Sequence, residues 1–204
     1  VFHNTYDEKG RLAATEDALG RVRRLIYDAK GLPECIILPD GSSMKFSRDE
    51  RGNILGVIHP DGVMVRYRYD ILNRLKELID AEGNKICYQY DNRDQLLAVT
   101  NREGAVRRFF YDVSGRMTEI QDFDGGIYQI TYNDMGSPES VKDKEGRISR
   151  REYDLAGNVT AEIFPSGERV FYEYDRENRV TKMRRTTAEG EEGTVLGYAY
   201  DLAG

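Results

Sequence analysis

The residues of this sequence best suited to chemistry are aspartates, tyrosines and arginines that recur at one interval. The stretch Tyr-Asp-x-x-Gly-Arg-Leu begins at Tyr6, and close variants begin at Tyr69, Tyr111 and Tyr174. A carboxylate repeated along a chain could ligate calcium, and a row of phenol rings could bind sugars or bases by stacking. The spacing of these residues decides whether they form a site or build the fold.

The other residues with catalytic or metal-binding potential are few. His3 and His59 are the only histidines and stand in unrelated sequence contexts, so a catalytic pair is not expected. Cys35 and Cys87 cannot supply four zinc ligands, and we expect two free thiols. No Gly-x-Ser-x-Gly, His-Glu-x-x-His or phosphate-loop pattern occurs. We therefore predict no enzyme activity, no catalytic residue, no metal site and no cofactor.

Composition excludes several classes of protein. The 204 residues carry 32% charged side chains and a net charge of −6, which disfavours a nucleic-acid partner. Fourteen Tyr and seven Phe argue against disorder, because disordered chains are poor in aromatic residues. No apolar run is long enough to insert into a membrane. The chain begins without Met and stops within a repeat, so we expect it to be part of a longer protein.

The elements that must position the aspartates and tyrosines follow a period of twenty-one residues. The Tyr-Asp position falls at 6, 27, 48, 69, 90, 111, 132, 153 and 174, and then at 200. Arg48 is the one anchor that is not Tyr, and Asn133 is the one following residue that is not Asp. We expect the five extra residues of the final unit to form a solvated loop at about 186–193.

A residue type that tolerates positive φ stands four residues after each anchor, which predicts a left-handed turn position. It is Gly in seven units, with Asn73, Asp94 and Asn178 in the others. The Asp after the anchor is expected to close this turn through backbone hydrogen bonds. The structural anchors predicted on this basis are Tyr6, Asp7, Gly10, Tyr27, Asp28, Gly31, Tyr69, Asp70, Tyr90, Asp91, Tyr111, Asp112, Gly115, Tyr132, Gly136, Tyr153, Asp154, Gly157, Tyr174 and Asp175.

A second turn lies before each following anchor, and its fullest form is Pro-Asp-Gly, at 39–41 and 60–62. Pro presets φ and Gly supplies a left-handed position, which predicts a type I turn with a Gly bulge, as in a β-hairpin. The glycines predicted to close these hairpins are Gly20, Gly41, Gly62, Gly83, Gly104, Gly125, Gly146, Gly167 and Gly193.

The two segments between the turns are predicted to be strands. Before each anchor, apolar and aromatic residues alternate with polar ones, as in Val65-Tyr67-Tyr69, and all fourteen tyrosines share this register. After the anchor, apolar residues such as Leu75 and Leu78 are three apart, which indicates a bulge near the strand start. The fold class is therefore all-β: one array of hairpins over residues 1–204, forming a continuous, curved antiparallel sheet.

This geometry favours structural roles for the recurring residues. Each turn offers one Asp, and equivalent residues of successive hairpins lie about 10 Å apart, too far to share a calcium ion. The tyrosines are better placed for packing than for ligand stacking. Lys and Arg three residues before the anchor, such as Arg66 and Arg108, keep the other face soluble. The Arg or Asn that follows the turn Gly, as at Arg11, has no partner that the sequence identifies.

The twenty-one-residue period with its two turn motifs resembles the YD repeats of bacterial Rhs and wall-associated proteins, insecticidal toxin complexes and animal teneurins. The resemblance covers residues 6–204, with local departures at Arg48, Leu32-Pro33 and Arg151. It implies a β-ribbon that spirals into a hollow shell, which in toxin members encloses a C-terminal toxic domain. The self-cleavage segment of that family, around Asp-Pro-x-Gly-Leu, is absent from this sequence, so no proteolytic residue is carried over.

The resemblance implies a non-catalytic scaffold of a secreted or cell-surface protein, with the rest of the parent shell and its enclosed C-terminal domain as partners. Exposed strand edges are expected to allow self-association. The alternative is a module that binds a glycan or a cell-surface partner through the aromatic face or through residues 189–193. An enzyme would need a cluster of polar residues that breaks the repeat in one place, and the sequence pattern indicates none.

Overall fold

The computed structural model describes residues 2–200, and these contain nineteen β-strands and no helix, so none that could cross a membrane. The chain divides into two compact units that meet between Ala105 and Val106. All strand pairs within each unit are antiparallel, which confirms the predicted all-β hairpin repeat. Cys35 and Cys87 are free thiols.

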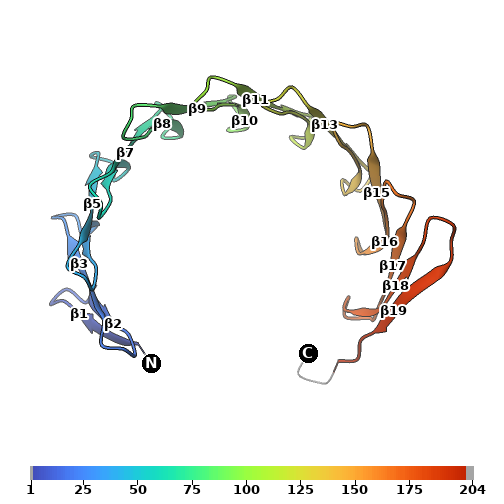
Figure 1. The fold of residues 1–204 in the computed structure, drawn as a ribbon, viewed down its shortest axis with the longest axis horizontal. Helices are drawn as coiled ribbons and strands as arrows, with labels where there is room; N and C mark the ends of the chain where they lie inside the picture. Colours follow the sequence, from blue (N-terminus) through green and yellow to red (C-terminus); the bar gives the residue numbers. More distant parts are fainter. Residues whose placement is uncertain (1, 201–204) are drawn as a thin grey trace. The chain divides into compact units, whose positions relative to one another are not determined.

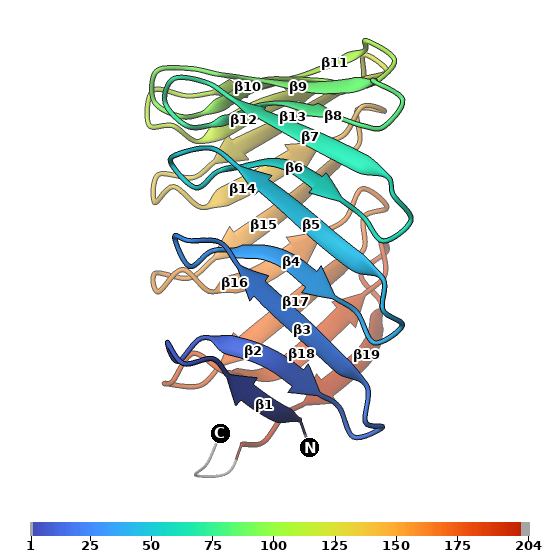
Figure 2. The same cartoon turned by 90° about the vertical axis from the view of Figure 1, so that its left-hand side faces the viewer.

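In the first unit, each strand pairs with the next one along the chain, so the sheet grows by successive hairpins (Figure 1). Its strands are β1 (His3–Tyr6), β2 (Leu12–Glu16), β3 (Val22–Tyr27), β4 (Pro33–Ile37), β5 (Ser43–Arg48), β6 (Ile54–Ile58), β7 (Met64–Tyr69), β8 (Leu75–Ile79), β9 (Lys85–Tyr90) and β10 (Leu96–Thr100). Figure 2 faces this unit and shows the turns gathered at the two ends of its strands.

The second unit follows the same scheme of neighbouring hairpins. Its strands are β11 (Val106–Tyr111), β12 (Met117–Gln121), β13 (Ile127–Tyr132), β14 (Pro138–Lys142), β15 (Ile148–Tyr153), β16 (Val159–Ile163), β17 (Arg169–Tyr174), β18 (Val180–Thr186) and β19 (Glu192–Gly197).

Both turns of each repeat use the same backbone arrangement. In the turn after Tyr111, the Asp112 N–H donates to the Arg116 carbonyl and the Gly115 N–H donates to the Asp112 carbonyl, at 2.9 and 3.0 Å. The turn that begins at Asp143 repeats both bonds. Asn73, Asp94 and Asn178 adopt φ of 68°, 66° and 59° where other repeats have Gly. Small polar side chains therefore meet the same left-handed requirement.

A bulge follows each anchor from Tyr6 to Tyr174 and explains the three-residue spacing of the apolar side chains. Tyr69 pairs with Leu75 and Tyr67 with Leu78, and the register shifts between Arg68 and Tyr69. The extra residue turns the strand, so that residues six and nine after the anchor reach the same face. We call the face that bears the anchor tyrosines the tyrosine face.

The final described hairpin corrects two predictions. The left-handed turn glycine is Gly190, at φ 86°, and the prediction of Gly193 is wrong, because Gly193 lies within β19. The loop expected at 186–193 is a shorter turn at 187–191 between paired strand residues, since β18 runs for seven residues against five in β16, and Thr186 is buried. The extra residues lengthen the hairpin, because ladder hydrogen bonds satisfy backbone groups that a loop would leave to water. Residues 201–204, which hold the last repeat's turn, lie outside the described residues.

Each unit has a thin core because it consists of a single sheet layer. The buried apolar residues are Val57, Ile79 and Ala98 in the first unit and Ala161 and Val170 in the second. Most side chains on both faces are half-buried by their neighbours. The contacts that hold one repeat against the next therefore matter more than they would in a layered domain.

Candidate functional site: the ladder of aspartate, arginine and tyrosine

In each unit, the predicted anchor residues lie where the strands end, along one side of the sheet. We call this row of strand ends one edge of the sheet. The anchor tyrosines end β1, β3, β7, β9, β11, β13, β15 and β17, and the aspartates begin the turns that follow. The left-handed glycines of these turns are Gly10, Gly31, Gly52, Gly115, Gly136 and Gly157, and those of the opposite edge are Gly20, Gly41, Gly62, Gly83, Gly104, Gly125, Gly146, Gly167 and Gly190. We call the first set the anchor turns and the second set the opposite turns.

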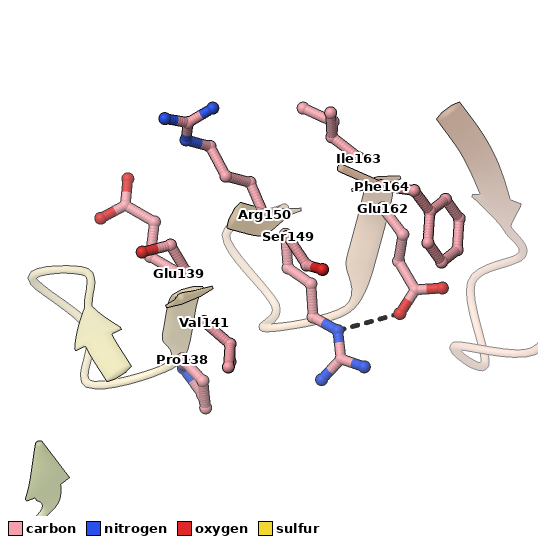
Figure 3. A pocket seen from close by; sticks show the side chains of 10 residues that line it. Pro138, Glu139, Val141, Ser149, Arg150, Glu162, Ile163 and Phe164 are labelled. Atoms are coloured by element: carbon pink, nitrogen blue, oxygen red, sulfur yellow. Dashed lines mark hydrogen bonds and ion pairs between the residues drawn. The ribbon is translucent and has the colours of Figure 1, made fainter. Parts of the chain in front are cut away.

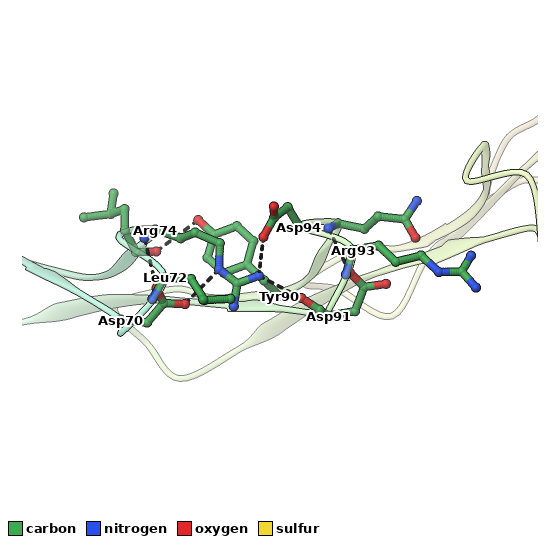
Figure 4. A network of polar contacts seen from close by, with 9 residues as sticks. Asp70, Leu72, Arg74, Tyr90, Asp91, Arg93 and Asp94 are labelled. Carbon is green, nitrogen blue, oxygen red and sulfur yellow. Dashed lines mark hydrogen bonds and ion pairs between the residues drawn. The ribbon is translucent and has the colours of Figure 1, made fainter.

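The aspartate of an anchor turn caps its own turn. One Asp70 carboxylate oxygen accepts the backbone N–H groups of Leu72 and Arg74, both at 2.9 Å (Figure 4). The other oxygen accepts Nε of Arg74 at 2.8 Å. The backbone and side-chain hydrogen bonds of Arg74 lower the pKa of Asp70 below its ordinary value of 3.8. Such a carboxylate is a satisfied structural group with little capacity left for a metal ion.

The arginine after the turn glycine connects one repeat to the next, a role that the sequence did not reveal. Arg74 donates from one terminal nitrogen to the Asp91 carbonyl at 2.7 Å and to the Asp94 carboxylate at 2.8 Å. Its guanidinium also lies over the Tyr90 ring, 4.8 Å from the centroid. The same stacking joins Arg11 to Tyr27, Arg116 to Tyr132 and Arg179 to Tyr200. A planar cation suits this position because it can pair with a carboxylate and cover a ring together.

The anchor tyrosine completes the connection with its hydroxyl group. Tyr90 donates to the carbonyl of Leu75, in the preceding hairpin, at 3.0 Å. Equivalent bonds of 2.7–3.1 Å run from Tyr27, Tyr69, Tyr132, Tyr153, Tyr174 and Tyr200 to Leu12, Ile54, Met117, Pro138, Val159 and Val180. Burial raises the pKa of Tyr69, Tyr90 and Tyr174, which keeps these phenols protonated and donating.

Three exceptions to the repeat preserve these contacts. Arg48, which replaces an anchor tyrosine, donates to the Pro33 carbonyl at 3.4 Å, the bond that a tyrosine makes elsewhere. Asn158 takes the place of the arginine and donates to both Asp154, in its own turn, and Asn178, in the next repeat. Asn53 bonds Asp49 and Asn73 in the same way. At these three positions the connection between repeats is thus kept although the residue type differs.

The opposite turns are held mainly by local contacts. Asp143 caps its turn and binds Nε of Arg147 at 2.7 Å, but the Arg147 side chain is 62% exposed and its other ion pair is with Glu145, inside the same turn. Contacts between repeats at this edge do not recur from one repeat to the next. One example is the ion pair of Lys144 with Asp124. Among the described residues, no three His, Cys, Asp or Glu side chains form a group that could hold a metal ion.

A group of polar residues interrupts the tyrosine face in the second unit. Arg151 and Glu162 oppose each other on β15 and β16, at a position where seven other described hairpins carry apolar or aromatic pairs. Ser149 lies beside them in place of a large side chain. In the sequence, Arg151, Glu162 and Ser149 are three separate departures from the repeat pattern. Only the bulged register shows that they share one face.

These features define a class of protein: an all-β wall of hairpins, fastened edge to edge by a repeated side-chain ladder. A family model described as the teneurin YD-shell matches residues 2–69 and 65–201, and the chain belongs to this family. This agrees with the predicted YD-repeat resemblance.

Two solved structures share the fold. One is the Photorhabdus luminescens Tc holotoxin pore with a substitution in TccC3, at a TM-score of 0.59 and 14% identity. The other is the TcdB2–TccC3 complex without its hypervariable C-terminal region, at a TM-score of 0.55 and 13% identity. The match covers 91% and 96% of this chain but only 14% and 15% of those chains. No curated protein matches the chain.

Proposed function

We propose that the chain is a section of non-catalytic shell wall in a larger secreted or cell-surface protein. The observation that carries this proposal is the hydrogen bond from seven of the anchor tyrosines to the hairpin before each of them. The aspartates, arginines and tyrosines that recur most often are engaged in joining repeats. Membership of a shell family supports the same role.

The wall's task is to enclose or present a C-terminal domain, which in toxin carriers is the toxic part. One of the similar structures is described as lacking a hypervariable C-terminal region, and the other as a holotoxin pore, which supports this arrangement for the parent protein. We also propose that residues 1–204 form one array of repeats. In the described pairings β1 bonds to β2 and β19 to β18, which leaves strand edges for further repeats or a second copy.

Limited proteolysis of the intact parent protein tests the enclosure. The C-terminal segment is expected to resist cleavage in the wild type. It should be cut rapidly in a variant that carries both Tyr90→Ala and Tyr132→Ala, because these changes loosen the wall. Leu19→Ala, at an exposed opposite turn, is the matched control and should leave the resistance unchanged. Equal cleavage of the C-terminal segment in all three proteins would contradict the proposal.

A further inference from the structure

At the position two residues before the anchor on the tyrosine face, one described hairpin carries a cross-strand pair of opposite charges, and it lies in the second unit. The residue two before an anchor opposes the residue nine after it, as Tyr67 opposes Leu78. In seven hairpins both partners are aromatic or aliphatic: Leu25–Ile36, Phe46–Val57, Tyr67–Leu78, Tyr88–Val99, Phe109–Ile120, Ile130–Val141 and Tyr172–Met183. The first hairpin has Asn4 and Thr15, which are polar but uncharged. Arg151 and Glu162 are the charged pair.

The pair is held in a defined geometry that leaves hydrogen-bonding groups unused. Nε of Arg151 donates to one Glu162 oxygen at 2.9 Å, and the Tyr172 hydroxyl donates to the other at 3.0 Å. The carboxylate is mostly covered, while the Arg151 side chain is 53% exposed. Within residues 2–200, no further hydrogen bond engages the two terminal nitrogens of Arg151. The guanidinium therefore presents free N–H donors beside a carboxylate with remaining lone pairs.

A hollow of about 280 Å³ lies at this pair. Figure 3 shows Pro138, Val141, Glu162 and Phe164 pointing to one side of the sheet, and Arg150 and Ile163 to the other. Val141 pairs with Ser149, which adds a hydroxyl group on the side of the carboxylate. The Phe164 ring is 39% exposed. The lining thus includes side chains from both sides of the sheet, and the side that bears Glu162 combines an apolar wall and an exposed ring with hydrogen-bond donors and acceptors.

The chemistry of the hollow selects the kind of ligand. Arg151 and Glu162 cancel each other's charge, so neither an anion nor a cation gains a net electrostatic attraction. A sugar ring has hydroxyl groups that both donate and accept, and an apolar face that packs on an aromatic side chain. The volume is just below the roughly 300–1,000 Å³ of small-molecule sites, which fits one ring rather than a long chain. We propose that this hollow binds a neutral saccharide residue through Arg151, Glu162, Ser149 and Phe164.

A purely structural role for the pair makes a different prediction. An exposed cross-strand ion pair contributes little to stability, and seven other hairpins fold with an apolar or aromatic pair at this position. If packing were the only function of the pair, replacing it by a Tyr–Leu pair, as at Tyr67 and Leu78, would leave ligand binding unchanged. The hollow, in contrast, would lose both its donors and its carboxylate.

Saturation-transfer NMR with four neutral sugars tests the site: glucose, galactose, mannose and N-acetylglucosamine, with glucuronate and glucosamine as charged comparisons. We expect transfer to at least one neutral sugar and none to the charged ones. Arg151→Tyr combined with Glu162→Leu should weaken binding more than tenfold, since hydrogen bonds to charged groups are removed. Glu162→Gln keeps the shape of the side chain and should weaken binding in the same direction. Thermal unfolding of both variants should match the wild type.

The matched control is Arg68→Ala with Glu77→Ala, which removes a cross-strand ion pair of 3.1 Å on β7 and β8. Arg68 and Glu77 lie outside the hollow, so this variant should bind the sugar as the wild type does. Absence of binding to all four neutral sugars would overturn the proposal. Binding to the charged sugars alone, or equal binding by the Tyr–Leu variant, would overturn it too.

Discussion

Two turns of the second unit have the same backbone hydrogen bonds, but the arginine contacts a neighbouring repeat in only one of them. The turn at Asp112–Arg116 and the turn at Asp143–Arg147 both place a carboxylate oxygen 2.9–3.0 Å from two backbone N–H groups. In both, the arginine Nε binds the other oxygen at 2.7 Å. The backbone hydrogen bonds that close the two turns also match within 0.1 Å. The local chemistry of the turn therefore does not distinguish the two edges of the sheet.

The arginines separate the two turns. The Arg116 guanidinium lies 4.6 Å from the ring centroid of Tyr132, in the next repeat, and Tyr132 in turn donates to the Met117 carbonyl at 2.7 Å. Arg147 binds only Asp143 and Glu145 of its own turn and is 62% exposed. The turn arginine thus joins neighbouring repeats at one edge and stays within its own turn at the other, where Lys144 contacts Asp124 of the preceding repeat instead.

The largest effect is expected from Tyr132→Ala, which removes the ring beneath Arg116 and the hydroxyl bond to Met117. Because Tyr132 is half-buried, we expect a loss of about 2–4 kcal/mol of unfolding free energy, measured by urea denaturation. Tyr132→Phe keeps the ring and should cost only about 1 kcal/mol. Equal losses for the two variants would show that the ring itself contributes nothing.

A smaller difference is expected between the two capping aspartates. Asp112→Ala should lower the urea midpoint more, since it removes the cap and releases Arg116 from its place over Tyr132. Asp143→Ala removes the same local bonds without a connection to another repeat, and should lower the midpoint less. Urea midpoints of the two variants check the order. The comparison fails if Asp143→Ala is the more damaging change.

The smallest effect is the response to acid, which both turns share. The backbone and side-chain hydrogen bonds of Arg116 lower the pKa of Asp112 below 3.8. For Asp143, burial raises the pKa, but the bonds from Arg147 outweigh it and leave the pKa lowered.

Because these pKa values are lower in the folded state, the unfolded chain binds protons first as the pH falls. The stabilisation is present above about pH 4 and is lost below it. Urea midpoints between pH 3 and 7 should therefore decline only at the acid end, and Asp112→Asn should flatten that decline. A decline centred near neutral pH would contradict the assignment.

The repeated pattern made the fold predictable, because each local signal agreed with every other. Positive-φ residue types marked both turns, and the three-residue spacing of Leu75 and Leu78 indicated the bulge that the structure contains. Gly193 was misassigned because it lies seven residues before Tyr200, as the turn glycines of the other repeats lie before their anchors, whereas the left-handed residue of this longer hairpin is Gly190. Pairing over a longer hairpin decides between them, and this is a tertiary property.

The site was less predictable than the fold, because its contacts run between repeats. Arg11 and Tyr27 are sixteen residues apart, and only the side-by-side arrangement of hairpins brings them to 4.4 Å. Arg151 and Glu162 each look like a single departure in the sequence. Their pairing depends on the bulge that shifts the register of β16.

The account's central claim is that arginine and tyrosine at the anchor turns couple neighbouring repeats. A double-mutant cycle of Arg116→Ala and Tyr132→Ala measures this coupling directly. Asn158→Ala with Tyr174→Ala is the matched cycle in the same unit, where Asn158 bonds Asp154 and Asn178 instead. We expect a coupling energy of about 0.5–2 kcal/mol for Arg116 and Tyr132, and about zero for the matched pair. Equal coupling energies in the two cycles, or none between Arg116 and Tyr132, would contradict the claim.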